Sequence, residues 1–269
     1  MRASEPKRVT AKISAADFTV DAFHRGDFWL KQPARRGHRA GMDAMMLAAA
    51  LPSAFAGRIA DLGAGAGGAG LAAIARCRSA STVLFERSAD MASFARQTLD
   101  LPQNAWLAQR ACVVETDVTL RGSARAQAGL SDNGFDATLM NPPFNAGHDR
   151  QTPDGLKAEA HVMEDGLLEA WIRTAAAITR SRGLVALIIR PEAIRAALDA
   201  LEGRFGALEV KPIHPRGDSA AIRIVIRGVR ASRKRLSFAP PLFLHEAGSD
   251  LFSPPADAIN NGRASLFGD

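Results

Sequence analysis

Short apolar runs alternate with amphipathic segments through most of this 269-residue chain. Five runs have the length of buried strands: 58–62, 82–85, 111–114, 135–140 and 183–189. Four segments carry apolar residues at helical spacing: 68–76, 88–99, 167–178 and 191–201. Consecutive strands joined by helices are parallel, because each crossover returns the chain to the same end of the sheet. The alternation therefore predicts an α/β fold, with a doubly wound, mostly parallel sheet covered by helices on both faces.

Two further strands are predicted after the last of these helices, at 208–213 and 221–229. The link between them is too short for a crossover, so the two strands must be antiparallel. Near the N-terminus, residues 18–33 have the pattern of a β-hairpin with His24-Arg25-Gly26-Asp27 as its turn. We thus expect a seven-stranded sheet with its last strand antiparallel, preceded by a hairpin extension and a helix at 42–51.

A glycine cluster separates the first core strand from its helix, in the sequence Asp61-Leu62-Gly63-Ala64-Gly65-Ala66-Gly67-Gly68. Glycines permit unusual backbone angles and let a ligand approach the main chain closely. The spacing also fits the dinucleotide fingerprint, which binds a pyrophosphate at a helix N-terminus. The Asp61 carboxylate would repel a pyrophosphate and attract a cationic amino-acid group, such as the methionine part of S-adenosylmethionine. A nicotinamide-dependent oxidoreductase remains the alternative.

Two more carboxylates follow the next strands. Glu86 ends the second strand, about 20 residues after the glycines, where an acidic residue can accept hydrogen bonds from ribose hydroxyls. Asp117 follows the third strand and could accept from the exocyclic amine of a cofactor adenine. Since aspartate also favours turns, a turn residue is the alternative for Asp117.

The sequence Asn141-Pro142-Pro143-Phe144 comes directly after the fourth strand. The two prolines carry no N–H, so the Asn141 side-chain oxygen and the Pro142 carbonyl remain as acceptors. Two acceptors can bind both hydrogens of a planar NH₂ group and localise its lone pair for attack on an electrophilic methyl. Phe144 could stack on the flat acceptor. These four residues are the predicted catalytic group of an N-methyltransferase.

Together the motifs resemble class I S-adenosylmethionine-dependent methyltransferases of the small-domain type, most closely the tRNA adenine-N6 methyltransferases that act on valine tRNA. The resemblance extends over about residues 18–245. Its motifs are Gln32-Pro33, the run from Gly37 to Ala44, the glycine cluster, Asn141 to Phe144, Ala160-His161 and Pro212-Ile213-His214-Pro215. It implies a Rossmann-like fold, S-adenosylmethionine as cofactor and methylation of an exocyclic nitrogen. The chain departs from the family at His38, where an aromatic residue is usual, and in having few lysines around the sixth strand.

In the resembling family, the segment that here contains Arg39 and Asp43 closes over the methionine end of the cofactor. A helix-capping pair is the alternative for these two residues. The predicted cofactor-binding residues are therefore Arg39, Asp43, Asp61, Gly63, Gly65, Gly67, Glu86, Asp117 and Asn141. We expect three regions: 1–52 with an arm, the hairpin and a cofactor-lid helix, 53–245 as the catalytic domain, and 246–269 as a tail. His161 is a candidate substrate contact or a surface residue.

The charge of the chain favours a nucleic-acid substrate. The 34 Lys and Arg residues exceed the 28 Asp and Glu residues, and arginine, which suits phosphate, predominates. Structured RNA is the predicted partner, and the resemblance implies that this RNA is tRNA. Candidate phosphate contacts are Arg35, Arg36, Arg39 and the basic run 227–235, for which a solvated surface is the alternative.

Other features narrow the setting. The sequence has no apolar run long enough for a membrane span and no secretory signal, so we expect a cytoplasmic enzyme. Cys77 and Cys112 lie in apolar patterns and are expected to be buried, and they do not have a metal-ligand spacing. The sequence predicts no metal, and it leaves monomer and homodimer open.

Three other functions are alternatives to methylation of RNA. One is methylation of a protein glutamine amide, whose NH₂ group could be bound by the same two acceptors of the Asn-Pro-Pro loop. A small-molecule O-methyltransferase would need a general base or a metal for its hydroxyl acceptor, and the sequence has no such cluster. A non-catalytic RNA-binding protein would not need the intact glycine cluster.

Overall fold

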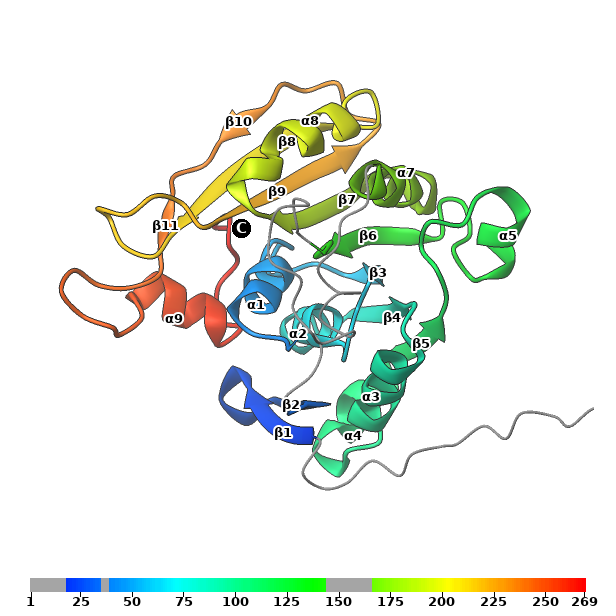
Figure 1. The fold of residues 1–269 in the computed structure, drawn as a ribbon, viewed down its shortest axis with the longest axis horizontal. Helices are drawn as coiled ribbons and strands as arrows, with labels where there is room; N and C mark the ends of the chain where they lie inside the picture. The colour runs from blue at the N-terminus through cyan, green and yellow to red at the C-terminus, as the bar shows by residue number, and fades with distance from the viewer. Residues whose placement is uncertain (1–17, 35–38, 144–165) are drawn as a thin grey trace, which may run out of the picture.

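The computed structural model describes residues 18–34, 39–143 and 166–269. Within them lies a nine-stranded sheet in the order β10-β8-β9-β7-β6-β3-β4-β5, with β11 also beside β8 (Figure 1). The seven long strands are β3 (Gly57–Leu62), β4 (Ala80–Glu86), β5 (Ala111–Glu115), β6 (Phe135–Met140), β7 (Thr179–Ile189), β8 (Phe205–His214) and β9 (Arg223–Arg230). The two short strands are β10 (Ser237–Phe238) and β11 (Leu242–Phe243).

The strand directions confirm the predicted doubly wound sheet. β3 pairs in parallel with β4 on one side and with β6 on the other, so the strand order reverses at β3. β9 is antiparallel to both β7 and β8, as the short link before it requires. The two-residue strands β10 and β11, both parallel to β8, were not predicted, because such short strands have no readable period.

Helices cover both faces of the sheet, as predicted (Figure 1). One apolar cluster contains side chains of α1 (Met42–Ala49), α2 (Gly68–Arg76) and α9 (Pro254–Asn260). The other contains side chains of α7 (Leu167–Ile178) and α8 (Ile194–Leu201). On α7, Leu168, Trp171, Ile172 and Ala175 are all buried, which is the apolar face that the sequence indicated. The expected lid helix, α1, has six of its residues buried in the first cluster and is therefore a core helix.

The N-terminal hairpin consists of β1 (Phe18–Phe23) and β2 (Phe28–Pro33), joined by a short 3-10 turn, η1 (His24–Gly26). It lies beside α3 (Ala89–Leu99) and is bound there by side chains. The Trp29 N–H donates to Asn104 Oδ1 at 2.9 Å, and the Lys31 N–H donates to Thr98 Oγ1 at 2.9 Å. Side chains thus satisfy backbone groups at the hairpin edge, which would otherwise be exposed for pairing.

Two stretches between the predicted strands and helices contain short helices. These are η2 (Pro102–Asn104) with α4 (Ala105–Ala108), and α5 (Gly122–Gln127). In α5 the buried Arg125 side chain donates to the Leu130 carbonyl and pairs with Asp132. Helices this short have too few residues for an apolar face, so no helical period in the sequence indicates them.

The segment expected to be a tail, 246–269, belongs to the folded core. Ala256, Ile259 and Leu266 are buried in the same cluster as α1, and the Leu266 N–H donates to the Ala49 carbonyl. The burial expected for the cysteines holds for Cys77 and is wrong for Cys112, which is exposed on β5. Among the described residues, no helix is long and apolar enough to span a membrane.

Candidate active site

The glycine cluster and the Asn-Pro-Pro loop lie next to each other, at the carboxyl ends of two paired strands. In the β3–β6 pair, Asp61 is opposite Leu139 and Leu62 is opposite Met140. Gly63 and Asn141 are therefore the next residues on strands that lie about 4.8 Å apart. Because strand order reverses at β3, this is the position where open α/β sheets bind their ligands.

The loop between β3 and α2 has a shape that requires glycine. Gly63, Gly65 and Gly67 have positive φ angles of 70°, 58° and 95°. A Cβ on Gly63 would lie 2.2 Å from the Trp171 ring of α7. Trp171 therefore lies directly against the loop, a contact that no spacing in the sequence could reveal.

Asp61 lies beneath the glycine loop and is only 3% exposed. Its Oδ2 accepts the N–H of Gly70, in the first turn of α2, at 2.7 Å. Burial raises the pKa of Asp61 to about 7, the Gly70 N–H opposes this, and the nearby Glu86 charge adds to the increase. The carboxylate thus connects β3 to α2, and its predicted role toward a cationic group remains a prediction.

Glu86, at the end of β4, braces the same loop from the other side. Its Oε2 accepts the Gly65 N–H and its Oε1 accepts the Ser88 N–H, each at 2.8 Å. The side chain is partly exposed beside the glycines, where the sequence places a ribose contact. Asp117 forms the turn that was its alternative, because its Oδ1 accepts the N–H and the hydroxyl of Thr119.

Arg39 and Asp43 do not form the capping pair that was their alternative. Arg39 donates to Asp21 Oδ2 at 2.8 Å and to Thr19 Oγ1 at 2.9 Å on the hairpin. Asp43 pairs with Arg223 of β9 at 2.8 Å, and α1 has no side-chain cap. Their predicted contact with the cofactor stays a prediction.

Gln32 links the hairpin to the segment that leads into α1. Its side chain is 1% exposed, its Oε1 accepts the Ala40 N–H at 2.8 Å, and its Nε2 donates to Asp21 Oδ2 at 2.8 Å. Ala40 in turn packs on the start of α2, since a Cβ on Gly68 would lie 2.5 Å from the Ala40 Cβ. A chain of contacts therefore runs from the hairpin to the glycine loop.

The catalytic motif is described in part. Asn141 and Pro143 are partly exposed and Pro142 is buried, while Phe144 and His161 lie outside the described residues. The predicted phosphate contacts Arg35 and Arg36 lie outside them as well. Among the described residues, no group of three or more His, Cys, Asp or Glu side chains could hold a metal ion.

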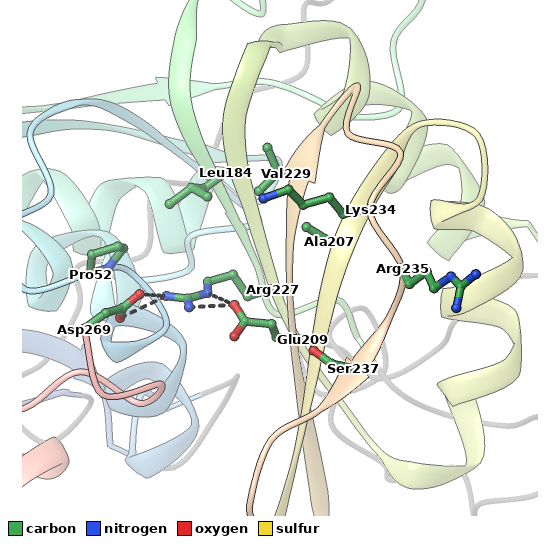
Figure 2. A pocket seen from close by; sticks show the side chains of 10 residues that line it. All are labelled: Pro52, Leu184, Ala207, Glu209, Arg227, Val229, Lys234, Arg235, Ser237 and Asp269. Atoms are coloured by element: carbon green, nitrogen blue, oxygen red, sulfur yellow. Dashed lines mark hydrogen bonds and ion pairs between the residues drawn. The ribbon is translucent and has the colours of Figure 1, made fainter.

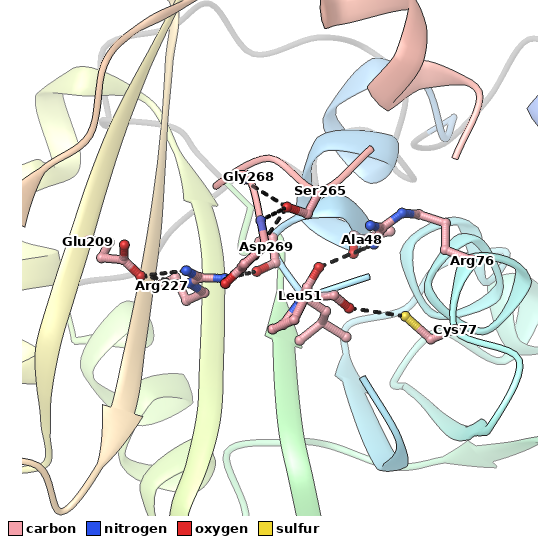
Figure 3. Close-up of polar contacts among 11 residues, drawn as sticks. Ala48, Leu51, Arg76, Cys77, Glu209, Arg227, Ser265, Gly268 and Asp269 are labelled. Atoms are coloured by element: carbon pink, nitrogen blue, oxygen red, sulfur yellow. Dashed lines mark hydrogen bonds and ion pairs between the residues drawn. The ribbon is translucent and has the colours of Figure 1, made fainter. Parts of the chain in front are cut away.

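The predicted RNA contacts in the run 227–235 are wrong for its first arginine. Arg227 is 8% exposed and pairs with Glu209 at 2.6 Å and with Asp269 at 2.8 Å (Figure 3). Arg230 is partly buried and donates to the carbonyls of Ala176 and Arg204. The exposed cations of the run are Arg233, Lys234 and Arg235.

These exposed cations lie at the amino-terminal edge of the sheet, opposite the glycine loop. The Ala207 N–H, near the start of β8, donates to the Lys234 carbonyl. A cavity of about 370 Å³ opens there, and Figure 2 shows Arg227 between Glu209 and Asp269 in its wall. The Lys234 side chain extends toward Leu184 and Val229, whereas Arg235 points away. The cavity is therefore separate from the candidate active site.

The strand order, the glycine loop with its carboxylates and the Asn-Pro-Pro loop define a class I S-adenosylmethionine-dependent methyltransferase. Residues 39–212 match the family model described as "Methyltransferase small domain", and the chain belongs to this family. This membership excludes the nicotinamide-dependent oxidoreductase. The loop combines glycines at positive φ with two carboxylates that accept its backbone N–H groups or those of α2, Glu86 and Asp61.

Solved structures agree with this assignment. A predicted O-methyltransferase from Agrobacterium tumefaciens is 46% identical, with 83% of this chain and 98% of that chain covered and a TM-score of 0.73. The T. thermophilus 16S rRNA N2 G1207 methyltransferase, solved with AdoMet and guanosine, is 20% identical, with 79% and 50% covered and a TM-score of 0.53. M. jannaschii TYW2, solved with AdoMet, is 10% identical, with 81% and 88% covered and a TM-score of 0.55. A comparison with curated proteins gave no match.

Proposed function

We propose that this enzyme transfers the methyl group of S-adenosylmethionine to the exocyclic N6 of an adenine in tRNA. The observation that carries the proposal is the position of Asn141-Pro142-Pro143 beside the glycine loop, where β3 and β6 end side by side. Acceptors at this position suit a planar NH₂ group, because each of its two hydrogens can be bound.

In the proposed reaction the cofactor supplies an electrophilic methyl group on its sulfonium. Asn141 Oδ1 and the Pro142 carbonyl each accept a hydrogen bond from one N–H of the acceptor amine. These bonds keep the nitrogen lone pair from delocalising into the adenine ring. The N–CH₃ bond forms as the S–CH₃ bond breaks, and the nitrogen then releases one proton to water. Positioning supplies most of the rate increase, so a strong base at the nitrogen is not required.

For the cofactor, we propose that the glycine loop and Glu86 hold the ribose and methionine parts, and that Asp61, Arg39 and Asp43 act at the methionine end. Glu86 is suited to this because it is partly exposed and sits directly on the Gly65 N–H. Asp117 is proposed at the adenine end, beside the turn at the end of β5.

O-methylation is the second candidate, because the Agrobacterium relative is described as a predicted O-methyltransferase. A hydroxyl acceptor needs a base or a metal to remove its proton. The Asn-Pro-Pro loop itself offers hydrogen-bond acceptors, and among the described residues no group of three or more His, Cys, Asp or Glu side chains could hold a metal ion. The amine acceptor is therefore favoured. The excess of arginine favours RNA over a protein amide as the substrate. The proposed location of the enzyme is the cytoplasm.

The test is mass analysis of nucleosides from unmethylated tRNA incubated with the enzyme and S-adenosylmethionine. We expect N6-methyladenosine with the wild-type chain and almost none with Asn141→Ala. Parallel incubations with a catechol and with a glutamine-containing peptide cover the alternatives. Methylation of either compound, without methylation of tRNA, would overturn the proposal.

A further inference from the structure

Large apolar side chains are exposed on one part of the sheet. Among the described residues, seven large hydrophobic side chains are strongly exposed, and all but Val20 fall between residues 222 and 252. They are Ile222, Leu236, Phe238, Phe243, Leu251 and Phe252. Apolar side chains that gather in this way, rather than singly, mark a surface for binding.

Several of them share one face of the sheet. Phe238 pairs with Val210 and Phe243 pairs with His214 on β8, so all four lie on the same side of the pleat. Val210 belongs to the apolar cluster of α7 and α8. Ile222, directly before β9, is exposed as well.

His214, Ile222 and Phe243 form what we call the edge platform. The His214 and Phe243 rings are in contact, with their centroids 5.5 Å apart. The Ile222 N–H donates to the Ile213 carbonyl, which places Ile222 at the carboxyl end of β8. All three residues lie where β8 ends and β9 begins, which is the edge of the sheet that carries the glycine loop.

The platform lies on the same edge of the sheet as the candidate active site. Along this edge β6 is followed by β7, β9, β8 and β11. Four steps of about 4.8 Å place the platform about 19 Å from the Asn141 loop. A molecule long enough to reach both must extend beyond a single base.

A cation lies beside the platform. Arg216 is two residues beyond His214 and pairs with Asp250. The Asp250 side chain is 98% exposed, so this pair contributes little stability and can exchange for a phosphate. Flat rings with guanidinium groups beside them are what proteins use to stack bases of single-stranded RNA.

We propose that the edge platform stacks a base of the substrate RNA that lies outside the catalytic pocket, in the same unpaired loop as the methylated adenine. This proposal rests on the proposed function, with RNA as the substrate. A second copy of the chain that adds a strand here is disfavoured. Pro240 and Pro241, between β10 and β11, remove two N–H groups from the outer edge that strand pairing would need.

Binding of unmethylated tRNA and of S-adenosylmethionine by Phe243→Ala tests the proposal. We expect the Kd for tRNA to increase about tenfold, the usual effect of removing one stacking side chain. Phe243→Trp should restore binding, while the Kd for S-adenosylmethionine stays unchanged in both variants. Phe238→Ala is the matched control, because Phe238 is more exposed and on the same face, about 13 Å farther from this edge.

The outcomes separate the two proposals. If the wild-type chain methylates tRNA and Phe243→Ala binds tRNA as tightly as the wild type, the proposed role of the platform is wrong and the proposed function stands. If Phe243→Ala and Phe238→Ala weaken tRNA binding equally, the effect is general and the platform is also wrong. A wild-type chain that neither binds nor methylates RNA overturns the proposed function itself. Sedimentation that shows a dimer broken by Phe243→Ala would assign the surface to a second copy instead.

Discussion

Asn141 is the residue on which the proposed chemistry depends most directly. It follows β6, next to the glycine loop, and it is partly exposed. We expect Asn141→Ala to lower the single-turnover rate of methyl transfer by about 10²–10³, the usual cost of one preorganised contact. The Kd for S-adenosylmethionine should change little. Gln109→Ala, at an exposed amide after α4, is the control, and an Asn141→Ala rate within a few-fold of wild type would remove Asn141 from catalysis.

Asp61 predicts a pH dependence of cofactor binding. In the ligand-free chain, burial raises its pKa to about 7, so the carboxyl is mostly protonated below that pH. If Asp61 meets the cationic end of the cofactor, binding needs the carboxylate and must displace a proton. The affinity for S-adenosylmethionine should then be constant above pH 7 and fall up to about tenfold for each pH unit below it.

Calorimetry between pH 5 and pH 8.5, in buffers of different ionisation enthalpy, measures both the affinity and the protons released. Asp61→Asn can still accept the Gly70 N–H, and it should bind more weakly with an affinity that does not vary with pH. An affinity of the wild-type chain that is equally flat across this range would show that Asp61 acts only as the link between β3 and α2.

Residue spacing located the strand ends that carry the candidate site residues, but it did not predict which residues their side chains contact. The glycines, Glu86 and Asn141 could be located because each comes at the end of a readable strand. The contacts of Asp61 with Gly70 and of Trp171 with Gly63 depend on how helices pack, and no local pattern encodes them. The burial of Arg227 was missed for the same reason, since its partners Glu209 and Asp269 are far away in the sequence.

Among the elements, the hairpin has a structural connection to the cofactor loop. Gln32 binds both the Ala40 N–H and Asp21, and Ala40 packs on the start of α2. We expect Gln32→Met to weaken S-adenosylmethionine binding about tenfold, because an unpaired buried N–H lets the segment before α1 move. The rate of methyl transfer at saturating cofactor should change less than the affinity.

Thr98→Val provides a matched control for the hairpin. It removes the bond to the Lys31 N–H, which holds the hairpin on α3, and leaves the Ala40 contact in place. Equal losses of cofactor affinity in Gln32→Met and Thr98→Val would mean that the hairpin matters only for general stability. A comparison of unfolding midpoints in urea shows how much stability each variant loses.

The elements that the sequence predicted are those long enough to have a period. β6 and α7 begin and end at the predicted residues, because each has at least six residues with a clear apolar pattern. α5, β10 and β11 have two to six residues and were not predicted. Phe243 of the platform belongs to this last group of elements, so its contact with His214 became visible only in the fold.

For the whole molecule, the C-terminal segment predicts an effect on stability. Arg227 joins Glu209 on β8 to Asp269 at the end of the described chain (Figure 3). We expect Arg227→Met to lower the free energy of unfolding by about 1–2 kcal/mol, less than for a fully buried pair because both carboxylates can be hydrated. Urea unfolding measures this. Arg195→Met, whose pair with Asp199 is almost fully exposed, should be neutral, and equal losses would contradict the role of Arg227.

The whole molecule also limits how its basic surface can bind RNA. The exposed cations Arg233 and Arg235 lie beside the amino-terminal end of β8, and the ten residues of that strand span about 33 Å. Only a large RNA could contact these arginines while its target base is at Asn141. For full-length tRNA, Arg233→Ala with Arg235→Ala should reduce the slope of log affinity against log salt by about 1.4, at about 0.7 per phosphate. For a short hairpin that carries only the target loop, the slope should not change. A change of equal size for both RNAs would place the two arginines near the target loop, and no change for either would make them a solvated surface.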